Sequence, residues 1–233
     1  MPRFAVYYIP PSRSPFYRLG TSLVRYDVRA KTMMHSDNPI RAQIPQFREE
    51  YVATPQPHGL HSTIVGPYQF EMKNLKKIEA AIADVLSCFD STSYFTLRTH
   101  RDFITFWGQQ SDIVALRYEP NASLIALHTM LLTGLVRYAT GSAYYPKYKD
   151  AAAHFSETEW QRIRHFYHPN VLDGYSPHFT LLAPYTDNRY RKEVERVLRS
   201  LFGKFTTHKL ESICLMVQED SDKNWHIHRE FER

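Results

Sequence analysis

The sequence predicts an α+β fold of two pseudo-symmetric lobes, each a small, mostly antiparallel sheet with helices outside it. Three observations predict it. One octapeptide occurs twice, the second copy starting 117 residues after the first. The apolar pattern around the first copy recurs around the second, and both halves follow the order strand, helix, variable loop, strand, helix, strand. We expect a single bilobal domain over residues 1–233, with lobes formed by residues 1–109 and 110–233.

The repeated segment reads HSTIVGPY over residues 61–68 and HFTLLAPY over residues 178–185. The two copies share His, Thr, Pro and Tyr at matching positions, and the apolar residues after each Thr predict a strand. Residues i and i+2 of a strand point to one face, about 7 Å apart along the chain. His61 and Thr63 therefore share a face, as do His178 and Thr180. A pseudo-twofold axis between the lobes would bring the two pairs together across a cleft.

The flanking elements match in the two halves. A β-like run over residues 4–10 resembles residues 114–120, and a helical pattern follows each motif. The predicted helices cover residues 15–24, 75–89, 122–136 and 190–201, and further strands are predicted over residues 94–97, 103–107 and 213–217.

The long connections, residues 26–57 and 137–175, allow two readings: lids over a ligand, or packed surface excursions. Within the second, Ser156 and Glu159 have capping-box spacing and predict a short helix.

The composition is that of a soluble globular protein, with 43% hydrophobic and 23% charged residues. No run approaches the roughly 18 apolar residues of a membrane span, and no secretory signal is evident. Cys88 and Cys214 are too few for a disulfide framework, and their apolar surroundings predict buried thiols. We expect a cytoplasmic monomer. The net charge of +5 is a mild bias toward anionic partners.

Two His-x-Thr tripeptides facing each other suit phosphoryl chemistry. An imidazole with a pKa near 6.5 serves as acid or base near neutral pH, and two provide both roles on one phosphorus. The Thr hydroxyls can donate to the non-bridging oxygens. A lone His-x-Thr is usually structural, but two copies in matching half-domains favour catalysis by His61, Thr63, His178 and Thr180. A bell-shaped pH dependence with both limbs within a couple of units of neutrality would follow.

The other histidines indicate no metal site. His226 and His228, two residues apart, lack a third ligand and read as an edge-strand feature; His165 and His168, three apart on a predicted helix, also lack one. His58 reads as a loop histidine near the cleft rim. We therefore predict neither metal nor cofactor.

Tyr68 and Tyr185 end the two octapeptides. They are predicted to bind substrate by stacking on a base at the groove, with symmetric packing below the lobes as the equal alternative.

The paired His-x-Thr motifs, about a hundred residues apart in a two-lobed α+β chain, resemble the 2H phosphoesterase superfamily. The segment Gly59-Leu60-His61 is similar to a bacterial branch often linked to phosphonate operons, although that branch usually has Phe where Leu60 stands. The resemblance implies metal-free hydrolysis of a cyclic phosphate or a 2′-5′ linkage on a nucleotide or RNA end, with the two histidines as the acid/base pair. Alternatives are a non-catalytic nucleotide- or RNA-binding module, a His-rich metalloprotein, and a phosphoesterase acting on a phosphorylated sugar of phosphonate metabolism.

Overall fold

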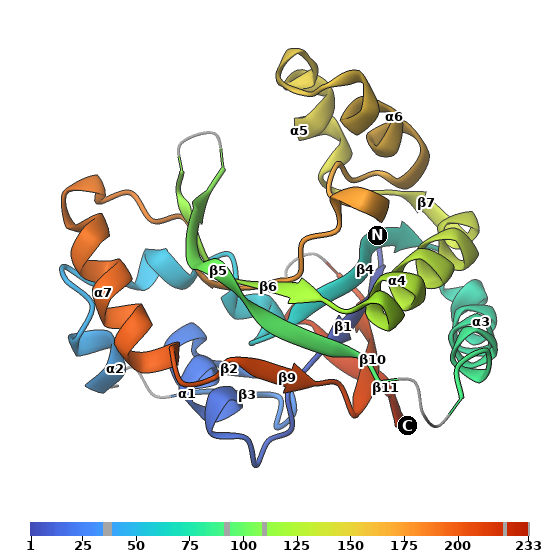
Figure 1. Ribbon diagram of the computed structural model, residues 1–233. Coiled ribbons are helices and arrows are strands. Elements are labelled where there is room, and N and C mark those ends of the chain that lie inside the picture. The colour runs from blue at the N-terminus through green and yellow to red at the C-terminus, as the bar shows by residue number, and fades with distance from the viewer. Residues whose placement is uncertain (35–38, 91–93, 109–110, 221–222, 233) are drawn as a thin grey trace.

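The computed structural model describes residues 1–233 except 35–38, 91–93, 109–110, 221–222 and 233. In this part of the chain nine strands form one curved antiparallel sheet (Figure 1), which confirms the α+β class. Along the sheet the strands are β11 (His226–Glu232), β10 (Ser212–Gln218), β1 (Arg3–Tyr8), β4 (Ser62–Phe70), β8 (His178–Leu182), β6 (Ile113–Pro120), β5 (Thr96–Trp107) and β9 (Thr207–Lys209), and β7 (Ala139–Gly141) also pairs with β4. A separate small hairpin joins β2 (Tyr26–Asp27) to β3 (Thr32–Met33).

Helices flank the two ends of this sheet. The helices are α1 (Pro15–Val24), α2 (Pro39–Ala42), α3 (Leu75–Ser87), α4 (Ala122–Leu135), α5 (Tyr145–Asp150), α6 (Glu157–Phe166) and α7 (Arg191–Phe202). Figure 1 shows α3 and α4 side by side at one end and α7 with α1 and α2 at the other. The four long predicted helices are confirmed to within two residues at each end. Local chemistry fixes their starts: Pro15 opens α1, and the Asn121 side chain accepts from the Leu124 N–H to cap α4.

The two sequence halves exchange strands in the sheet, and the division of the chain into two lobes stays a prediction. The last strand of the first half, β5, pairs with β6 of the second half, and β10 of the second half pairs with β1 of the first. The connection from β5 to β6 is short, which favours an antiparallel hairpin between them. In the repeat, β1 corresponds to β6 and β10 to β5, so the pairing of β1 with β10 is the equivalent one. The strands on either side of the central pair, β4 and β8, therefore come from both halves. The expected boundary itself, residues 109 and 110, lies outside the described residues.

The motif strands β4 and β8 meet at the centre of the sheet. Phe179, between the two motif residues of β8, has no exposed surface and packs edge-on against Phe16 with ring centroids 4.9 Å apart. Ser62, the matching residue of β4, is 1% exposed. Because successive strand residues alternate between faces, the burial of Phe179 and Ser62 turns the motif His and Thr side chains to the opposite face.

The long connections differ in how they pack. In the described part of residues 26–57, Tyr51 is buried, and its carbonyl accepts from the Ala183 N–H at 2.6 Å just after β8. In residues 137–175, the predicted capping box is confirmed: Ser156 and Glu159 bond reciprocally at the start of α6. Figure 1 shows α5 and α6 standing apart from the sheet on one side. The first connection is thus a packed excursion.

Two further expectations concern the chain as a whole. No helix among the described residues has the length and apolar character needed to cross a membrane. Cys214 is buried as predicted, whereas Cys88, which follows the last residue of α3, is exposed and corrects the prediction of a buried thiol.

Candidate active site

The pairing of β4 with β8 brings the two motifs together. Ser62 lies directly opposite Phe179 in antiparallel register. In that register His61 lies across from Thr180, and Thr63 lies across from His178. All four side chains are partly exposed and share one face of the sheet. The four predicted catalytic residues are therefore brought together.

The two histidines are held by matching hydrogen bonds. Nδ1 of His61 lies 2.9 Å from the carbonyl oxygen of Gly59, and Nδ1 of His178 lies 2.9 Å from the carbonyl oxygen of Ser176. A carbonyl oxygen only accepts, so each Nδ1 carries the proton, and Nε2 is the nitrogen left for a substrate. Gly59 has φ 70° and ψ −177°, a conformation essentially confined to glycine, and this conformation aims its carbonyl at His61.

Burial keeps both histidines neutral in the free protein. The pKa of His61 is lowered to about 4: burial is the main cause, the hydrogen bond to Gly59 opposes it, and the neighbouring His178 adds to it. Burial likewise lowers the pKa of His178, with Arg117 adding to the effect and Ser176 opposing it. The expected acid limb of a pH profile therefore moves well below the value predicted for an unperturbed imidazole.

Aromatic rings support the His61 side of the site. Tyr7 stacks on His61 with ring centroids 4.0 Å apart, and its hydroxyl lies 3.0 Å from Nδ1 of His58. His58 in turn stacks on Trp225 at 5.1 Å. His58 is thus part of the site's wall, where the sequence indicated only a loop position. These contacts fix the plane of the His61 ring.

A cation and a second ring flank His178. Arg117 lies opposite His178 on β6, and its Nε donates to Oγ of Ser176 at 3.2 Å. Trp107 of β5 meets the His178 ring edge-on with centroids 4.5 Å apart. Sequence analysis missed both, although a signal was present: in the repeat, Arg117 occupies the position that matches Tyr7.

The connection over residues 137–175 reaches the site through His168. This residue lies beyond the end of α6, so it does not share a helix face with His165 as predicted. The pKa of His168 is lowered to about 4. Burial is the main cause, and the nearby His178 and His128 lower it as well. His168 accepts at Nδ1 from the Asn170 N–H, which leaves its Nε2 protonated, the reverse of the motif histidines.

His128 anchors the same connection to the motif strand. Its Nδ1 donates to the carbonyl of Ile64 at 2.6 Å, and its Nε2 accepts from the Leu172 N–H at 3.0 Å. Its ring stacks on Tyr175 at 4.0 Å, and the Tyr175 hydroxyl donates to the Thr63 carbonyl. The backbone beside Thr63 is therefore tied to both α4 and the long connection.

The substrate-binding prediction for Tyr68 and Tyr185 is corrected by their burial. Tyr68 is 2% exposed, and its hydroxyl donates to the carbonyl of Phe166. Tyr185 is 1% exposed and packs edge-on against Tyr51 at 4.9 Å. Tyr68 lies seven positions after His61, and an odd offset along a strand places it on the opposite face. Both rings are packing residues.

The remaining His pairs give no metal cluster. His226 and His228 lie on β11, the edge strand predicted for them, and Nε2 of His228 bonds Glu79 of α3 at 3.0 Å. Among the described residues, no group of three or more His, Cys, Asp or Glu side chains is arranged to hold a metal ion.

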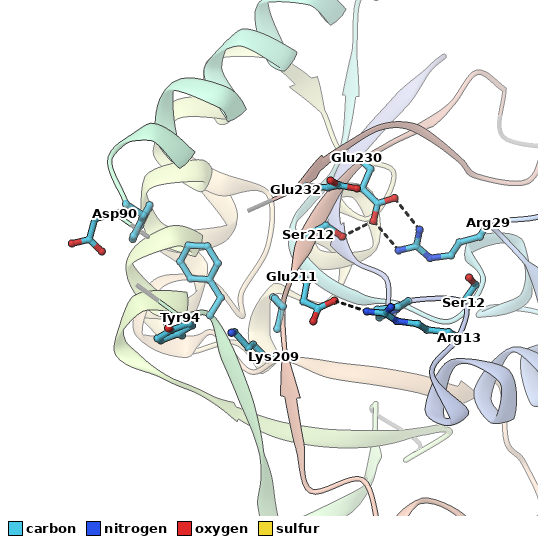
Figure 2. A pocket seen from close by; sticks show the side chains of 14 residues that line it. Ser12, Arg13, Arg29, Asp90, Tyr94, Lys209, Glu211, Ser212, Glu230 and Glu232 are labelled. Carbon is cyan, nitrogen blue, oxygen red and sulfur yellow. Dashed lines mark hydrogen bonds and ion pairs between the residues drawn. The ribbon is translucent and has the colours of Figure 1, made fainter. Parts of the chain in front are cut away.

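A separate pocket of about 940 Å³ lies away from the motifs (Figure 2). Its charged side chains are largely paired with one another: Arg29 donates to both carboxylate oxygens of Glu230 at 2.9 Å, and Arg13 pairs with Glu211 at 3.7 Å. No motif residue lines this pocket, so the candidate active site remains the face that carries the two motifs.

Comparison with known families gives one sequence match. Residues 72–226 match the family model described as "Protein of unknown function (DUF1045)", which is more than half of the chain. The chain belongs to this family. No curated protein matches the sequence. The two motifs on which this chain resembles the 2H phosphoesterases lie paired at the centre of the sheet.

Similar solved structures include a crystal structure described as a phosphoesterase and one of E. coli LigT complexed with 3′-AMP. Each is 13% identical, with 100% of this chain and 98% of the other covered and a TM-score of 0.49. Kluyveromyces marxianus Usb1 is 8% identical, with 97% of each chain covered and a TM-score of 0.40.

Proposed function

We propose that this protein is a metal-independent phosphodiesterase that hydrolyses a cyclic phosphate or a 2′-5′ phosphodiester on a nucleotide or RNA end. One observation carries the proposal. Two histidines with matching Nδ1 bonds, and two threonines, share one face of the two paired central strands. This arrangement offers two Nε2 atoms and two hydroxyls to one phosphate.

In the proposed reaction, Nε2 of one histidine takes a proton from water as its oxygen attacks phosphorus. The other histidine, protonated at Nε2, gives its proton to the ester oxygen as the P–O bond breaks. The hydroxyls of Thr63 and Thr180 donate to the non-bridging oxygens and stabilise their developing charge. The orientation of the substrate decides which of His61 and His178 is the base.

Arg117 supplies a positive charge on the same face, directly across from His178. It attracts the anionic phosphate and favours the charge that accumulates on the non-bridging oxygens. A bound phosphate in turn raises the pKa of each adjacent imidazole, so the general acid gains its proton when substrate binds.

The competing reading, a nucleotide-binding module without turnover, is less well supported. Binding an anion favours permanently charged side chains, whereas burial holds both His61 and His178 neutral in the free protein. Neutral imidazoles with a free Nε2 suit proton transfer.

The experiment is a hydrolysis panel in EDTA: 2′,3′-cyclic nucleotides, short RNAs ending in a cyclic phosphate, 2′-5′ dinucleotides and phosphorylated sugars with a cyclic phosphate. The proposal expects turnover of at least one nucleotide or RNA substrate with no loss on chelation. Turnover confined to the sugars would show that the substrate is a phosphorylated sugar and not a nucleotide or RNA end. Turnover abolished by EDTA would refute the metal-independent mechanism. Binding of the panel without any turnover would favour the binding module.

A further inference from the structure

Arg3 lies on the motif face, at the far end of a row of ring contacts that begins at His61. Its guanidinium carbon is 5.5 Å from the centroid of the Trp225 ring. Trp225 lies 5.8 Å from Tyr7, and Tyr7 lies 4.0 Å from His61. Arg3 is linked to His61 through Trp225 and Tyr7 and does not contact His61 itself. Its fixed positive charge therefore lies near the four motif residues but not against them.

Arg3 has no carboxylate partner among the described residues. By contrast, Arg29 pairs with both oxygens of Glu230, and Arg41 pairs with Glu49 at 2.6 Å. Within the described part of the chain, Nε of Arg3 and Nε1 of Trp225 are also buried without a hydrogen-bond acceptor. A half-buried guanidinium with unmet donors is poorly satisfied by its own protein and suits an anionic ligand.

The connection over residues 137–175 contributes a tyrosine hydroxyl near Arg3. Tyr144 is half-buried at the start of α5, and its hydroxyl bonds no other described residue. Burial raises the pKa of Tyr144, and the charge of Arg3 opposes this effect, so the Tyr144 hydroxyl lies within electrostatic range of Arg3. The pKa of His58 is lowered chiefly by burial, then by His61, and the charge of Arg3 adds to the effect. Arg3 on β1 and Tyr144, which precedes α5, thus lie within electrostatic range of each other.

We propose that Arg3, assisted by Tyr144 and supported by Trp225, binds a second phosphate group of the substrate. The inference rests on the proposed function, in which the two motifs hold the scissile phosphate. Guanidinium recognises phosphate through paired N–H donors, and a phenolic hydroxyl adds a further donor. The substrate class is then a phosphoester that carries a separate terminal phosphate, such as a 5′-phosphorylated nucleotide or RNA end.

Binding tests the inference without requiring turnover. The probes are 3′-AMP, adenosine 3′,5′-bisphosphate and adenosine 3′-phosphate 5′-diphosphate, which extend the same ligand by one phosphate at a time, measured by titration calorimetry at fixed salt. At least one longer ligand should bind wild type about tenfold more tightly than 3′-AMP, a factor that corresponds to about 1.4 kcal/mol. Arg3→Gln should bind all three alike, and Arg3→Lys should recover part of the preference.

Arg18→Gln is the matched control, because it removes the same charge from an exposed position on α1. It should keep the wild-type preference. A wild type that binds all three ligands equally would overturn the inference, and so would an Arg3→Gln variant, folded by circular dichroism, that keeps the preference. An Arg3-dependent preference in a protein that hydrolyses no phosphodiester would leave the second site standing while the proposed function fails.

Discussion

Replacement of Gly59 by alanine tests how the backbone positions His61. A Cβ at this residue would lie 2.9 Å from Cβ of the buried Val28 and 3.2 Å from the Tyr26 carbonyl oxygen. The backbone conformation, φ 70° and ψ −177°, costs a non-glycine residue roughly 1–3 kcal/mol, and the overlap with Val28 adds roughly 1–3 kcal/mol. We expect Gly59→Ala to lower the free energy of unfolding by about 2–6 kcal/mol.

The substitution should also reduce turnover, because relief of the strain rotates the carbonyl away from Nδ1 of His61. A displacement of about 1 Å in a catalytic group can cost roughly 10²-fold in rate. The assay is phosphodiester hydrolysis at a temperature where circular dichroism shows the variant to be folded, beside urea unfolding of the same sample.

Two matched substitutions separate this effect from a general one. Ser176→Ala, at the equivalent place before His178, keeps the carbonyl and loses only the Arg117 bond, so it should cost about 0.5–1.5 kcal/mol. Gly134→Ala on α4 meets nothing within 4 Å and should stabilise by about 0.5–1 kcal/mol. A Gly59→Ala protein with wild-type stability and turnover would refute the reasoning.

Three further predictions follow from the contacts and pKa shifts. Burial lowers the pKa of both His61 and His178, so the pair with a single added proton is most abundant below pH 6.5. In steady-state pH profiles, kcat/KM, which reports the free protein, should therefore peak below pH 6.5, and kcat, which reports the substrate complex, should peak at a higher pH. Glu79→Gln removes the negative charge and one of the two acceptor oxygens that His228, Arg229 and Lys76 share, and should cost about 1–2 kcal/mol at pH 7 by urea unfolding, after allowance for its exposed partners. The pKa of Glu79 is lowered to about 2, chiefly by His228, so the stability it contributes is present above pH 4.5 and lost as pH falls toward 2; an equal loss at pH 7 and pH 2 would contradict this. Arg117→Gln should reduce kcat/KM roughly 10- to 100-fold while Arg18→Gln leaves it unchanged, and equal effects of the two would remove Arg117 from the site.

Sequence pattern predicted the elements well because their cause is local. Helical periodicity, Pro15 and Asn121 at helix starts, and the capping box at Ser156 all act within a few residues. The exchange of β5 and β10 between the halves was missed because strand partners are chosen by tertiary register, which periodicity does not encode. The small strands β7 and β9, of three residues each, carry too little pattern to be recognised.

The candidate site divides in the same way. The repeat alone identified His61, Thr63, His178 and Thr180. The His and Thr of each motif are two residues apart, and in a strand residues at that spacing point to the same face. Tyr7 and Trp107 were missed because their roles depend on which strand lies beside β4 or β6. The tyrosines that end the octapeptides, Tyr68 and Tyr185, are repeated because both pack in the core. A repeat alone does not distinguish a packing residue from a substrate-binding one.

The most direct test of the account is to remove each motif histidine and vary the leaving group. His61→Ala and His178→Ala would be compared with wild type, in EDTA, on a substrate with an alcohol leaving group and on its 4-nitrophenyl analogue. A general acid or base typically contributes about 10²- to 10⁴-fold, so both variants should lose at least 10²-fold on the alcohol ester. The variant that lacks the acid should recover most of that loss on the 4-nitrophenyl ester, which needs no proton to leave, and the variant that lacks the base should not. Retention of activity within about tenfold by either variant on the alcohol ester would contradict the account.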